Sequence, residues 1–391
     1  MRKILFMHQV SDIGGGSYCL LNILKNIDRS EFDPIVLLKS QGPLSCELEK
    51  LNVKVYYFSA MKAIPYNRSL LSRGSLRSYI KVISSVPKFL KFLMQLNVDI
   101  LYLNNMMLYH YLKPAKELGL KTVIHVREHW PEDEHLIQLS LARKFVYKYA
   151  DKIIAINRYS SKIFPEKEST IVYDWIDMDS RFREFHLSDY FGNNVGDLKI
   201  YLYTGGLQSI KGASEVLDAF TNIIHDANAR LLVIGIDPSL NLIGIKGTIK
   251  NILSKIGLNC YEISVKKQIA SDSRIICIPA TYYLSHIIQQ AYCNLSYFTI
   301  PHANLTLAEC EILGTPSVAA CTDESLEYSL NGELSILYKI NDKKDFYRAI
   351  KNLDENYGKL KSSLSDKANI VKSMFSPESN IAKLNSVLKL L

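Results

Sequence analysis

The sequence has few cysteines, and none of them stands in a pattern that builds a disulfide framework or a zinc site. Its 391 residues contain seven cysteines, an odd number, and no Cys-x-x-Cys pair occurs. Regularly spaced, paired cysteines are typical of small secreted domains and of zinc modules. We therefore expect neither class, and a reducing compartment in which most of these cysteines are buried apolar side chains.

Long apolar runs are also missing. No stretch of 18 apolar residues occurs, so no transmembrane helix is expected. The apolar segment after Met1-Arg2-Lys3 is only a few residues long, which is too short for the core of a signal peptide and is typical of a first buried strand. The sequence predicts a cytoplasmic protein that is attached peripherally to the inner face of the cytoplasmic membrane.

Acidic residues are absent from positions 50–98, although the chain as a whole contains 39 of them. This window holds nine lysines and arginines, which is more than the net charge of +8. Over 76–96 basic residues alternate with apolar ones, which predicts one or two amphipathic helices interrupted near Pro87. Such a helix suits an anionic membrane surface; an ordinary solvated helix is the alternative, and no nucleic-acid recognition motif accompanies the charges. The expected membrane or acceptor contacts are Arg73, Arg77, Lys81, Lys88 and Lys91.

The chain does contain a steady alternation of short apolar runs with longer amphipathic ones, which is the pattern of parallel α/β folds. Its length favours two domains. We expect a Rossmann-like N-terminal domain at 1–180, a turn-rich linker at 181–197, a Rossmann-like C-terminal domain at 198–374 and a final helix at 375–391 that crosses back to the first domain. Strands are expected at 4–7, 33–38, 53–58, 100–103, 121–126, 150–156, 170–173, 199–204, 230–236 and 317–320.

Glycines occupy the turn between the first expected strand and the first helix, as Gly14-Gly15-Gly16. Glycine lets a ligand approach the backbone closely, and the N-terminus of a helix attracts negative groups. We expect Gly15 and Gly16 to contact a ligand, with a tight turn that binds nothing as the alternative. The spacing is not Gly-x-Gly-x-x-Gly, so an NAD-dependent oxidoreductase is disfavoured.

A second glycine turn follows the strand at 199–204. It begins with Gly205-Gly206 and ends with Lys211-Gly212 before a helix at about 213–224. An ammonium group just before a helix adds to the helix dipole and neutralises a diphosphate. We expect Gly205, Gly206 and Lys211 to bind a diphosphate, with a solvated surface lysine as the alternative.

Positions 307–320 predict a helix that leads directly into a buried strand. Gly314 can take the left-handed cap of this helix, and Pro316 prevents the helix from continuing. Glu309 is expected in the first turn, where a ligand hydroxyl would meet both a carboxylate and free backbone N–H groups.

Together these motifs resemble those of family 4 retaining glycosyltransferases, which have the GT-B fold. In that family a strand ending in glycine leads to a Lys-Gly pair, and a later motif of two glutamates with seven residues between them is followed by Gly-Thr-Pro-Val. The matching residues here are Gly205, Lys211-Gly212, Glu309 and Gly314-Thr315-Pro316-Ser317-Val318, and segments 150–156 and 171–177 are similar to two further family motifs. The resemblance implies two Rossmann-like domains facing a cleft, with Lys211 on the nucleotide diphosphate and Glu309 on the ribose hydroxyls.

The resemblance also implies the donor, the acceptor and the reaction. The donor would be a nucleotide-diphosphate sugar, UDP- or GDP-linked, with no other cofactor and no metal, and the backbone near Asn304, Leu305 and Thr306 would hold the sugar. No Asp-x-Asp motif stands at an expected strand end, which agrees with metal independence. The expected function is retaining transfer of the sugar to a saccharide acceptor, lipid-linked, in surface polysaccharide synthesis, with no nucleic acid as partner.

Three positions depart from the family pattern. The first glutamate of the paired motif is Pro301, with His302 and Asn304 as candidates to replace it in part; the arginine often found after the first glycine is Gly206; and an Asn-Gly pair is Asp174-Trp175. Two other hypotheses therefore stay open. The chain could be a nucleotide-sugar-binding partner that has lost catalysis, or a sugar-nucleotide epimerase of the same architecture, which the missing acid at Pro301 disfavours.

A polar cluster, His125-Val126-Arg127-Glu128-His129, follows the strand at 121–126. The family usually has a histidine near this place, close to the donor sugar, and both His125 and Arg127 are candidates for it. Because a poised imidazole or carboxylate can take a proton from an acceptor, the candidate catalytic residues are His125, Arg127 and Glu128. The alternative is a structural polar cluster at the end of a strand.

Overall fold

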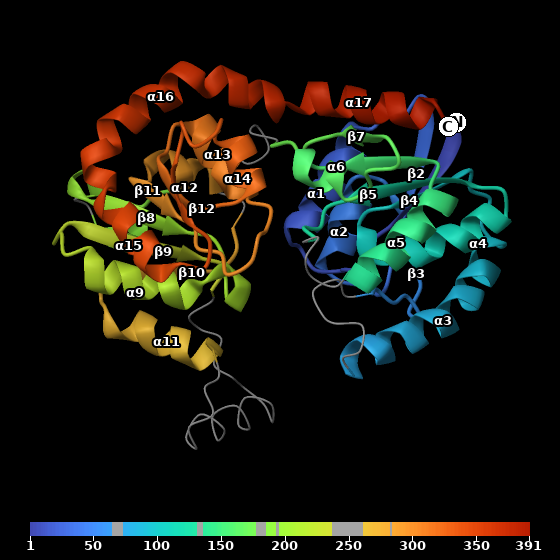
Figure 1. Ribbon diagram of the computed structural model, residues 1–391, viewed down its shortest axis with the longest axis horizontal. Coiled ribbons are helices and arrows are strands. Elements are labelled where there is room, and N and C mark those ends of the chain that lie inside the picture. Colours follow the sequence, from blue (N-terminus) through green and yellow to red (C-terminus); the bar gives the residue numbers. More distant parts are fainter. Residues whose placement is uncertain (65–72, 131–135, 177–184, 193–194, 237–260, 282–283) are drawn as a thin grey trace. The chain divides into compact units, whose positions relative to one another are not determined.

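The chain forms two compact units in a computed structural model, which describes residues 1–64, 73–130, 136–176, 185–192, 195–236, 261–281 and 284–391 (Figure 1). Unit 1 consists of Met1–Trp175 and Met374–Leu391, and unit 2 of Ile176–Ser373. Of the linker expected at 181–197, positions 181–184 and 193–194 lie outside the described residues. The domain boundaries expected from the sequence stay predictions.

Unit 1 is built on a parallel sheet with the strand order β3-β2-β1-β4-β5-β6-β7. Most of these strands are continuous apolar runs that are buried on both faces, as parallel sheets require. The strands are β1 Arg2–Met7, β2 Phe32–Leu38, β3 Lys54–Tyr57, β4 Ile100–Leu103, β5 Lys121–Val126, β6 Lys152–Ala155 and β7 Ser169–Ile171.

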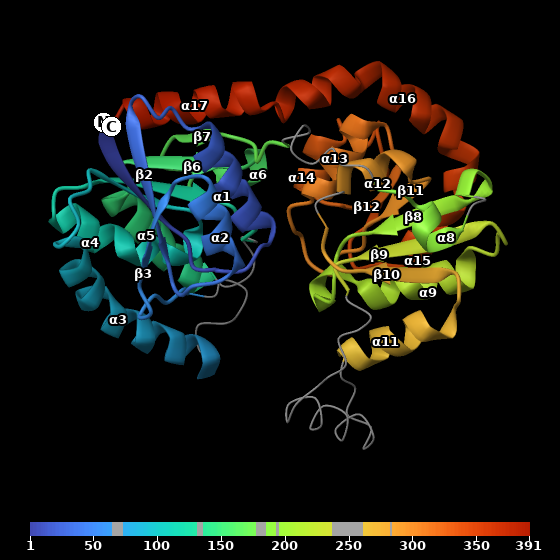
Figure 2. The ribbon, with the colours of Figure 1, turned by 180° about the vertical axis from the view of Figure 1, so that it is seen from behind.

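Helices cover both faces of this sheet (Figure 1 and Figure 2). One core lies under α3, α4 and α5, and a second core lies under α1, α2 and α17. The helices of unit 1 are α1 Gly15–Asn26, α2 Pro43–Lys50, α3 Arg73–Leu93, the 3-10 helix η1 Met106–Tyr111, α4 Leu112–Glu117, α5 Leu136–Tyr149, α6 Arg158–Lys162 and α17 Pro377–Lys389. The last helix therefore completes the core of the first unit, where Leu384 and Leu388 are fully buried.

The basic segment at 73–93 is one continuous helix, α3, although Pro87 stands inside it. Proline removes one helical N–H and crowds the carbonyl four residues earlier. Pro87 and Ile83 are both exposed, so water can satisfy the carbonyl that loses its partner. The sequence left open one or two helices here, but the interruption that it predicted near Pro87 was wrong.

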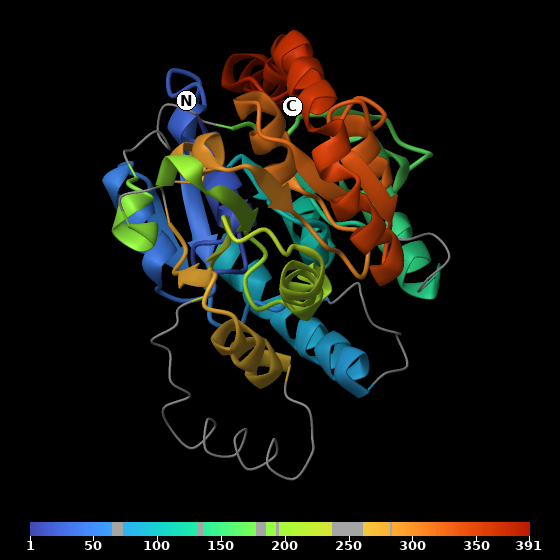
Figure 3. The same cartoon turned by 90° about the vertical axis from the view of Figure 1, so that its left-hand side faces the viewer.

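Unit 2 repeats the plan with a parallel sheet in the order β10-β9-β8-β11-β12-β13. Its strands are β8 Lys199–Tyr203, β9 Ala229–Ile234, β10 Ile275–Ile278, β11 Cys293–Leu295, β12 Ser317–Cys321 and β13 Ile336–Lys339. Its helices are α8 Ser188–Phe191, η2 Val195–Asp197, η3 Ser209–Lys211, α9 Ala213–Ile223, α11 Tyr261–Ser271, α12 Leu284–Gln290, α13 Leu305–Leu313, α14 Asp323–Tyr328, α15 Lys343–Lys351 and α16 Leu353–Met374. Figures 1 and 2 label most of them, and Figure 3 shows the ribbon of this unit from another side.

Each sheet reverses its strand order at its first strand. In unit 1 the strands on either side of β1 are β2 and β4, and in unit 2 the strands on either side of β8 are β9 and β11. Ligands of doubly wound sheets bind outside the carboxyl ends of the strands at such a switch point. The two glycine turns of the sequence follow β1 and β8, so the fold places both of them at these points. Within the described part of the chain, no helix has the length and apolar character needed to cross a membrane.

Candidate functional site

The turn after β8 depends on glycine for reasons internal to the fold. A side chain on Gly205 would place its Cβ 2.2 Å from the Tyr203 hydroxyl, and one on Gly212 would lie 2.3 Å from the ring of Tyr297. Gly206 and Gly212 also have φ values of +60° and +58°, which favour glycine. The Tyr203 hydroxyl lies 3.2 Å from the carbonyl oxygen of Gly206 and 3.0 Å from that of Lys211. These contacts fix the backbone of the turn just before α9.

Lys211 lies at the end of η3, immediately before the N-terminal residues of α9. Its side chain is half-buried, and this burial lowers the pKa of the ammonium group. Among the residues that the structure describes, no carboxylate lies within 4.0 Å of it, whereas Lys199 and Lys343 of the same unit both form ion pairs. A half-buried lysine with no acidic partner beside a helix N-terminus suits an anionic ligand.

The start of α13 lies beside the end of β8. The hydroxyl of Thr204 donates to the hydroxyl of Thr306 over 3.2 Å, which joins two segments that are 102 residues apart. Asn304 caps α13, because its Oδ1 accepts from the N–H of Leu307 over 3.3 Å while its amide nitrogen donates to the Ser296 hydroxyl over 2.9 Å. The predicted donor-binding residues Gly205, Gly206, Asn304, Leu305 and Thr306 therefore lie on two neighbouring segments at the same switch point.

Glu309 lies in the second turn of α13, so the expectation that it stands in the first turn was wrong. The helix begins at Leu305, because Asn304 caps it before the apolar stripe at Leu307 begins. Glu309 is 1% exposed, and Glu311 of the same helix is fully buried. Burial raises the pKa of Glu311 to about 8, although the Ser335 hydroxyl donates to its carboxyl group over 3.0 Å. The role of Glu309 in holding a ribose stays a prediction.

The glycine turn of unit 1 differs from that of unit 2, because the fold does not require its glycines. Gly14 to Gly16 do not have positive φ angles. A Cβ on Gly14 or Gly15 would meet no atom within 4 Å, and one on Gly16 would meet only Cε1 of His8 at 3.8 Å. All three residues are exposed at the start of α1. Packing does not require glycine at these three positions. The lack of side chains does, however, leave the N-terminus of this helix accessible to a ligand.

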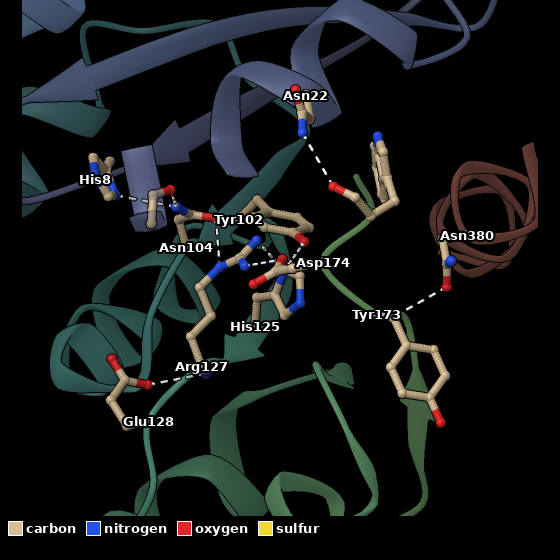
Figure 4. A network of polar contacts seen from close by, with 12 residues as sticks. His8, Asn22, Tyr102, Asn104, His125, Arg127, Glu128, Tyr173, Asp174 and Asn380 are labelled. Atoms are coloured by element: carbon tan, nitrogen blue, oxygen red, sulfur yellow. Dashed lines mark hydrogen bonds and ion pairs between the residues drawn. The ribbon is translucent and has the colours of Figure 1, made fainter. Parts of the chain in front are cut away.

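Arg127 forms the centre of a buried polar network at the carboxyl edge of the unit 1 sheet (Figure 4). Its guanidinium group forms an ion pair with Asp174, donates from Nε to Oδ1 of Asn104 over 3.3 Å, and lies 3.2 Å from Nδ1 of His125 through Nη2. The Tyr102 hydroxyl is 2.6 Å from the same ring nitrogen of His125. The sequence departure at Asp174 is thus one half of an ion pair whose other half is the predicted Arg127.

Burial sets the charge state of this network. Burial and then the charge of Arg127 hold the pKa of His125 well below its ordinary value, so the imidazole is neutral. Burial is the largest influence on Arg127 and opposes its charge, but the carboxylate of Asp174, with smaller contributions from Cys19 and Tyr102, keeps the pKa of the guanidinium above its ordinary value. The region therefore holds one buried cation, one buried anion and a neutral histidine.

The sequence did not single out His8, Tyr102 and Asn104, which belong to the same network. The amide nitrogen of Asn104 lies 3.1 Å from Nδ1 of His8 and 3.3 Å from the carbonyl oxygen of Gly16. His8 follows β1 directly and Asn104 follows β4 directly. The sequence signal that could have identified His8 and Asn104 is a polar residue immediately after a buried strand. Such residues come together because the carboxyl ends of neighbouring parallel strands lie at the same edge of the sheet.

The side chains of Glu128 and His129 have partners other than His125. Oε2 of Glu128 accepts from the backbone N–H groups of Met106 and Arg127 over 2.9 and 3.1 Å, and burial raises the pKa of this carboxyl to about 7. The ring of His129 stacks on Tyr159 with centroids 4.0 Å apart. The structure therefore brings His125 and Arg127 together, and places Glu128 beside them through the backbone alone.

The predicted basic face is exposed along α3. Arg77, Lys81, Lys88 and Lys91 are exposed, whereas the side chain of Arg73 lies outside the described residues. Ile80 and Ile83 are 60% and 70% exposed beside these charges. Lys62 also lies near this face, as its lowered pKa indicates. Desolvation lowers this pKa first, and the positive charges of Lys39 and Lys81 lower it further. The face thus combines several cations with exposed aliphatic side chains.

In the described part of the chain, no group of three or more histidine, cysteine and acidic side chains is arranged to hold a metal ion. No protein-family model matches the sequence, and no curated protein sequence matches it.

Solved structures of similar fold span the whole chain. The structure of HepE from Anabaena in complex with UDP and glucose superposes with a TM-score of 0.74 at 18% identity, covering 100% of both chains. A glycosyltransferase from Rickettsia africae ESF-5 gives a TM-score of 0.71 at 14% identity over 99% of this chain and 98% of its own. A UDP-N-acetylglucosamine 2-epimerase gives 0.60 at 12% identity over 93% and 90%. At these identities the shared property is the fold, and the two Rossmann-like parallel-sheet units confirm the GT-B architecture expected from the sequence.

Proposed function

We propose that this chain is a glycosyltransferase that uses a nucleotide-diphosphate sugar as donor. The observation that carries the proposal is the arrangement around β8. There a rigid glycine turn, a half-buried Lys211 with no carboxylate within 4.0 Å among the described residues, and the start of α13 lie at one switch point. The GT-B fold is a general scaffold, so the function is inferred from this site.

The chemistry of the proposed reaction needs fixed positive groups at the leaving diphosphate. Negative charge develops on this group as the glycosidic bond breaks, so donors and cations that are already in place favour the transition state over the ground state. Lys211 and the N-terminus of α9 supply such groups beside the turn. In the proposed reaction Glu309 holds the ribose, and backbone near Asn304, Leu305 and Thr306 holds the sugar.

UDP is the nucleotide that we favour for the donor, with GDP as the alternative. Structures of the same fold were solved with UDP and glucose and with UDP-glucose. We further propose, from the family resemblance, that the transfer is retaining and needs no metal, and that the acceptor is a lipid-linked saccharide in surface polysaccharide synthesis.

The exposed basic face of α3 supports a peripheral membrane location for the acceptor. Arg77, Lys81, Lys88 and Lys91 face solvent together with Ile80 and Ile83. Basic side chains attract anionic headgroups, and exposed aliphatic side chains insert among them. We propose that this face binds the inner surface of the cytoplasmic membrane and brings the lipid-linked acceptor to unit 1.

A second candidate function rests on Pro301. Proline stands where the resembled family has the first glutamate of its paired motif, and it provides no carboxylate. A nucleotide-sugar-binding partner without catalytic activity would keep Lys211 and tolerate this change. The epimerase hypothesis has a structural neighbour in its favour and the same proline against it.

The test is a thermal-shift titration with UDP-, GDP-, ADP- and dTDP-sugars, followed by an assay for nucleotide release. A ligand at a hundred times its dissociation constant adds about 2.7 kcal/mol of stability. We expect one UDP-sugar to stabilise the wild type but neither Lys211→Ala nor Glu309→Ala, while Lys351→Ala, an exposed lysine on α15, behaves as the wild type. Binding without turnover of donor would favour the partner, and formation of an epimeric UDP-sugar without an acceptor would favour the epimerase. No stabilisation by any nucleotide sugar would overturn the proposal.

A further inference from the structure

The partners of Arg127 determine where several protons lie, because a guanidinium group donates hydrogen bonds and accepts none. Arg127 donates to the carboxylate of Asp174, to Oδ1 of Asn104 and to Nδ1 of His125. Each of these three atoms must therefore be an acceptor. This condition is stronger than the distances alone, since amide orientation and histidine tautomer are ordinarily open to choice.

For His125 the condition places the proton on Nε2. Nδ1 receives Nη2 of Arg127 at 3.2 Å and also lies 2.6 Å from the Tyr102 hydroxyl, so it carries no hydrogen. A neutral imidazole then has its single N–H at Nε2. This nitrogen is buried and has no acceptor among the described residues. A buried N–H group without an acceptor destabilises the folded chain. His125 thus has one N–H donor whose partner the described part of the chain does not supply.

The requirement that Arg127 donates also fixes the orientation of the Asn104 amide, and through it the hydrogen bonds up to the glycine turn before α1. Because its oxygen accepts from Arg127, its nitrogen must be the atom that donates to Nδ1 of His8 and to the carbonyl oxygen of Gly16. His8 therefore carries its proton on Nε2, which lies 3.1 Å from the Ser17 hydroxyl. Ser17 in turn donates to the carbonyl oxygen of Asp12 over 2.7 Å. Every bond in this series has a fixed direction from Arg127 to the turn before α1.

Asp174 is the group that makes a buried Arg127 tolerable. The two side chains are 8% and 17% exposed, and a buried cation without a partner costs several kcal/mol. In the family that the sequence resembles, the residue at this place is asparagine. An aspartate here matches the arginine at position 127, so that each residue neutralises the charge of the other.

We propose that Arg127, held by Asp174, is a positioning residue that orders the protons of His125, Asn104 and His8. In this arrangement Arg127 acts through its neighbours and does not touch a ligand. It makes His125 a neutral N–H donor at the carboxyl edge of β5 and ties Gly16 to Asn104. A neutral donor suits an uncharged oxygen, such as a sugar hydroxyl, and this last step rests on the proposed function.

The proton positions can be measured directly by NMR of histidine labelled with ¹⁵N in the ring. His8→Gln and His125→Gln variants assign the two signals. At pH 7 we expect both residues to be neutral with the proton on Nε2. In the double variant Arg127→Met/Asp174→Asn, which leaves neither charge buried alone, we expect both signals to become those of a tautomer mixture. The matched control Arg143→Met removes another partly buried arginine of unit 1, which donates to the carbonyl of Ile163, and should change neither signal.

A proton on Nδ1 of either histidine in the wild type would overturn the inference, and so would a folded double variant with unchanged signals. If the double variant does not fold, the wild-type tautomers still decide. The single variant Arg127→Lys keeps the positive charge but loses the planar fork of N–H donors. We therefore expect that it does not keep the proton on Nε2 of the two histidines.

Activity separates this inference from the proposed function. If the chain transfers a sugar, the double variant should lose about tenfold or more in kcat through lost positioning, while UDP still stabilises it through Lys211. A wild type with the expected tautomers but no nucleotide binding would refute the function and leave the positioning role intact.

Discussion

The side-chain oxygen of Asn380 accepts a hydrogen bond of 3.0 Å from the backbone N–H of Tyr173, which lies 207 residues earlier in the chain. The same asparagine donates to the carbonyl oxygens of Met374, the last residue of α16, and of Ser376, which caps α17. Tyr173 and Phe375 also have ring centroids 5.3 Å apart. One buried side chain therefore connects the segment that leaves unit 1 at Trp175 with the segment that returns to it at Met374.

Replacement of Asn380 by alanine should destabilise unit 1. The variant removes the acceptor that Asn380 gives to the N–H of Tyr173 and the donor that it gives to the carbonyl of Met374, while the carbonyl of Ser376 keeps the backbone N–H of residue 380. Because the place is fully buried, we expect a loss of about 2–4 kcal/mol in the free energy of unfolding. Urea denaturation with a probe of unit 1 measures the loss. Asn385→Ala is the matched control on the same helix, since Asn385 accepts a single bond of 3.4 Å and should cost well under half as much. Equal losses in both variants would contradict the role given to Asn380.

The two glycine turns should respond in opposite ways to alanine. Gly212→Ala places a Cβ against the ring of Tyr297 and forces alanine to a φ of +58°, so a loss of about 2 kcal/mol or more is expected. Gly15→Ala puts a good helix former into open space at the first residue of α1, so its stability should equal or slightly exceed that of the wild type. Melting temperatures test both. A ligand that contacts the unit 1 turn would bind Gly15→Ala more weakly in spite of its normal stability.

The pH dependence of stability should reveal Glu311. Its pKa is raised to about 8 in the folded chain from an ordinary 4.5, so the native state binds an extra proton between these values. Its contribution is complete below about pH 4.5 and is lost as pH rises through about 8. Relative to the wild type, Glu311→Gln should therefore gain roughly 1–4 kcal/mol between pH 5 and pH 9.

Measurement of the difference between the two proteins at each pH isolates Glu311. His8, whose pKa is lowered to about 3 by burial and by Arg127, contributes a loss on acidification below about pH 6.5, which both proteins share. Glu355→Gln on the exposed side of α16 controls for the substitution itself. A flat difference curve would mean that Glu311 is already ionised in the native protein at neutral pH.

Charge reversal on α3 should weaken binding to anionic vesicles. Lys81→Glu/Lys88→Glu changes two exposed side chains that are seven residues apart, and each near-surface charge contributes about 1 kcal/mol. We expect at least a tenfold weaker binding to phosphatidylserine vesicles in co-sedimentation, and little binding of either protein to phosphatidylcholine. Lys344→Glu/Lys351→Glu makes the same change with the same spacing on α15 and should retain binding. Equal effects of the two pairs would mean that the net charge of the protein, and not the face of α3, determines binding to the vesicles.

The sequence by itself determined the strands, the glycine turns and the repeated α/β plan, because these depend on short-range pattern. Buried parallel strands are apolar runs that need no partner to be recognised, and glycine before a helix marks a turn in any context. Lys211 stands just before α9, as the sequence predicted. Short-range pattern was less reliable for the start of α13, since the cap at Asn304 moved the helix start and left Glu309 in the second turn.

Only the tertiary structure decided which polar residues belong together. Arg127 and Asp174 are 47 positions apart, and Thr204 and Thr306 are 102 apart. They meet because parallel strands bring their carboxyl ends to one edge of a sheet, and the strand order in the sheet differs from the order in the chain. Burial at that edge then set the charges, since a low-dielectric environment keeps His125 neutral and requires a partner for Arg127.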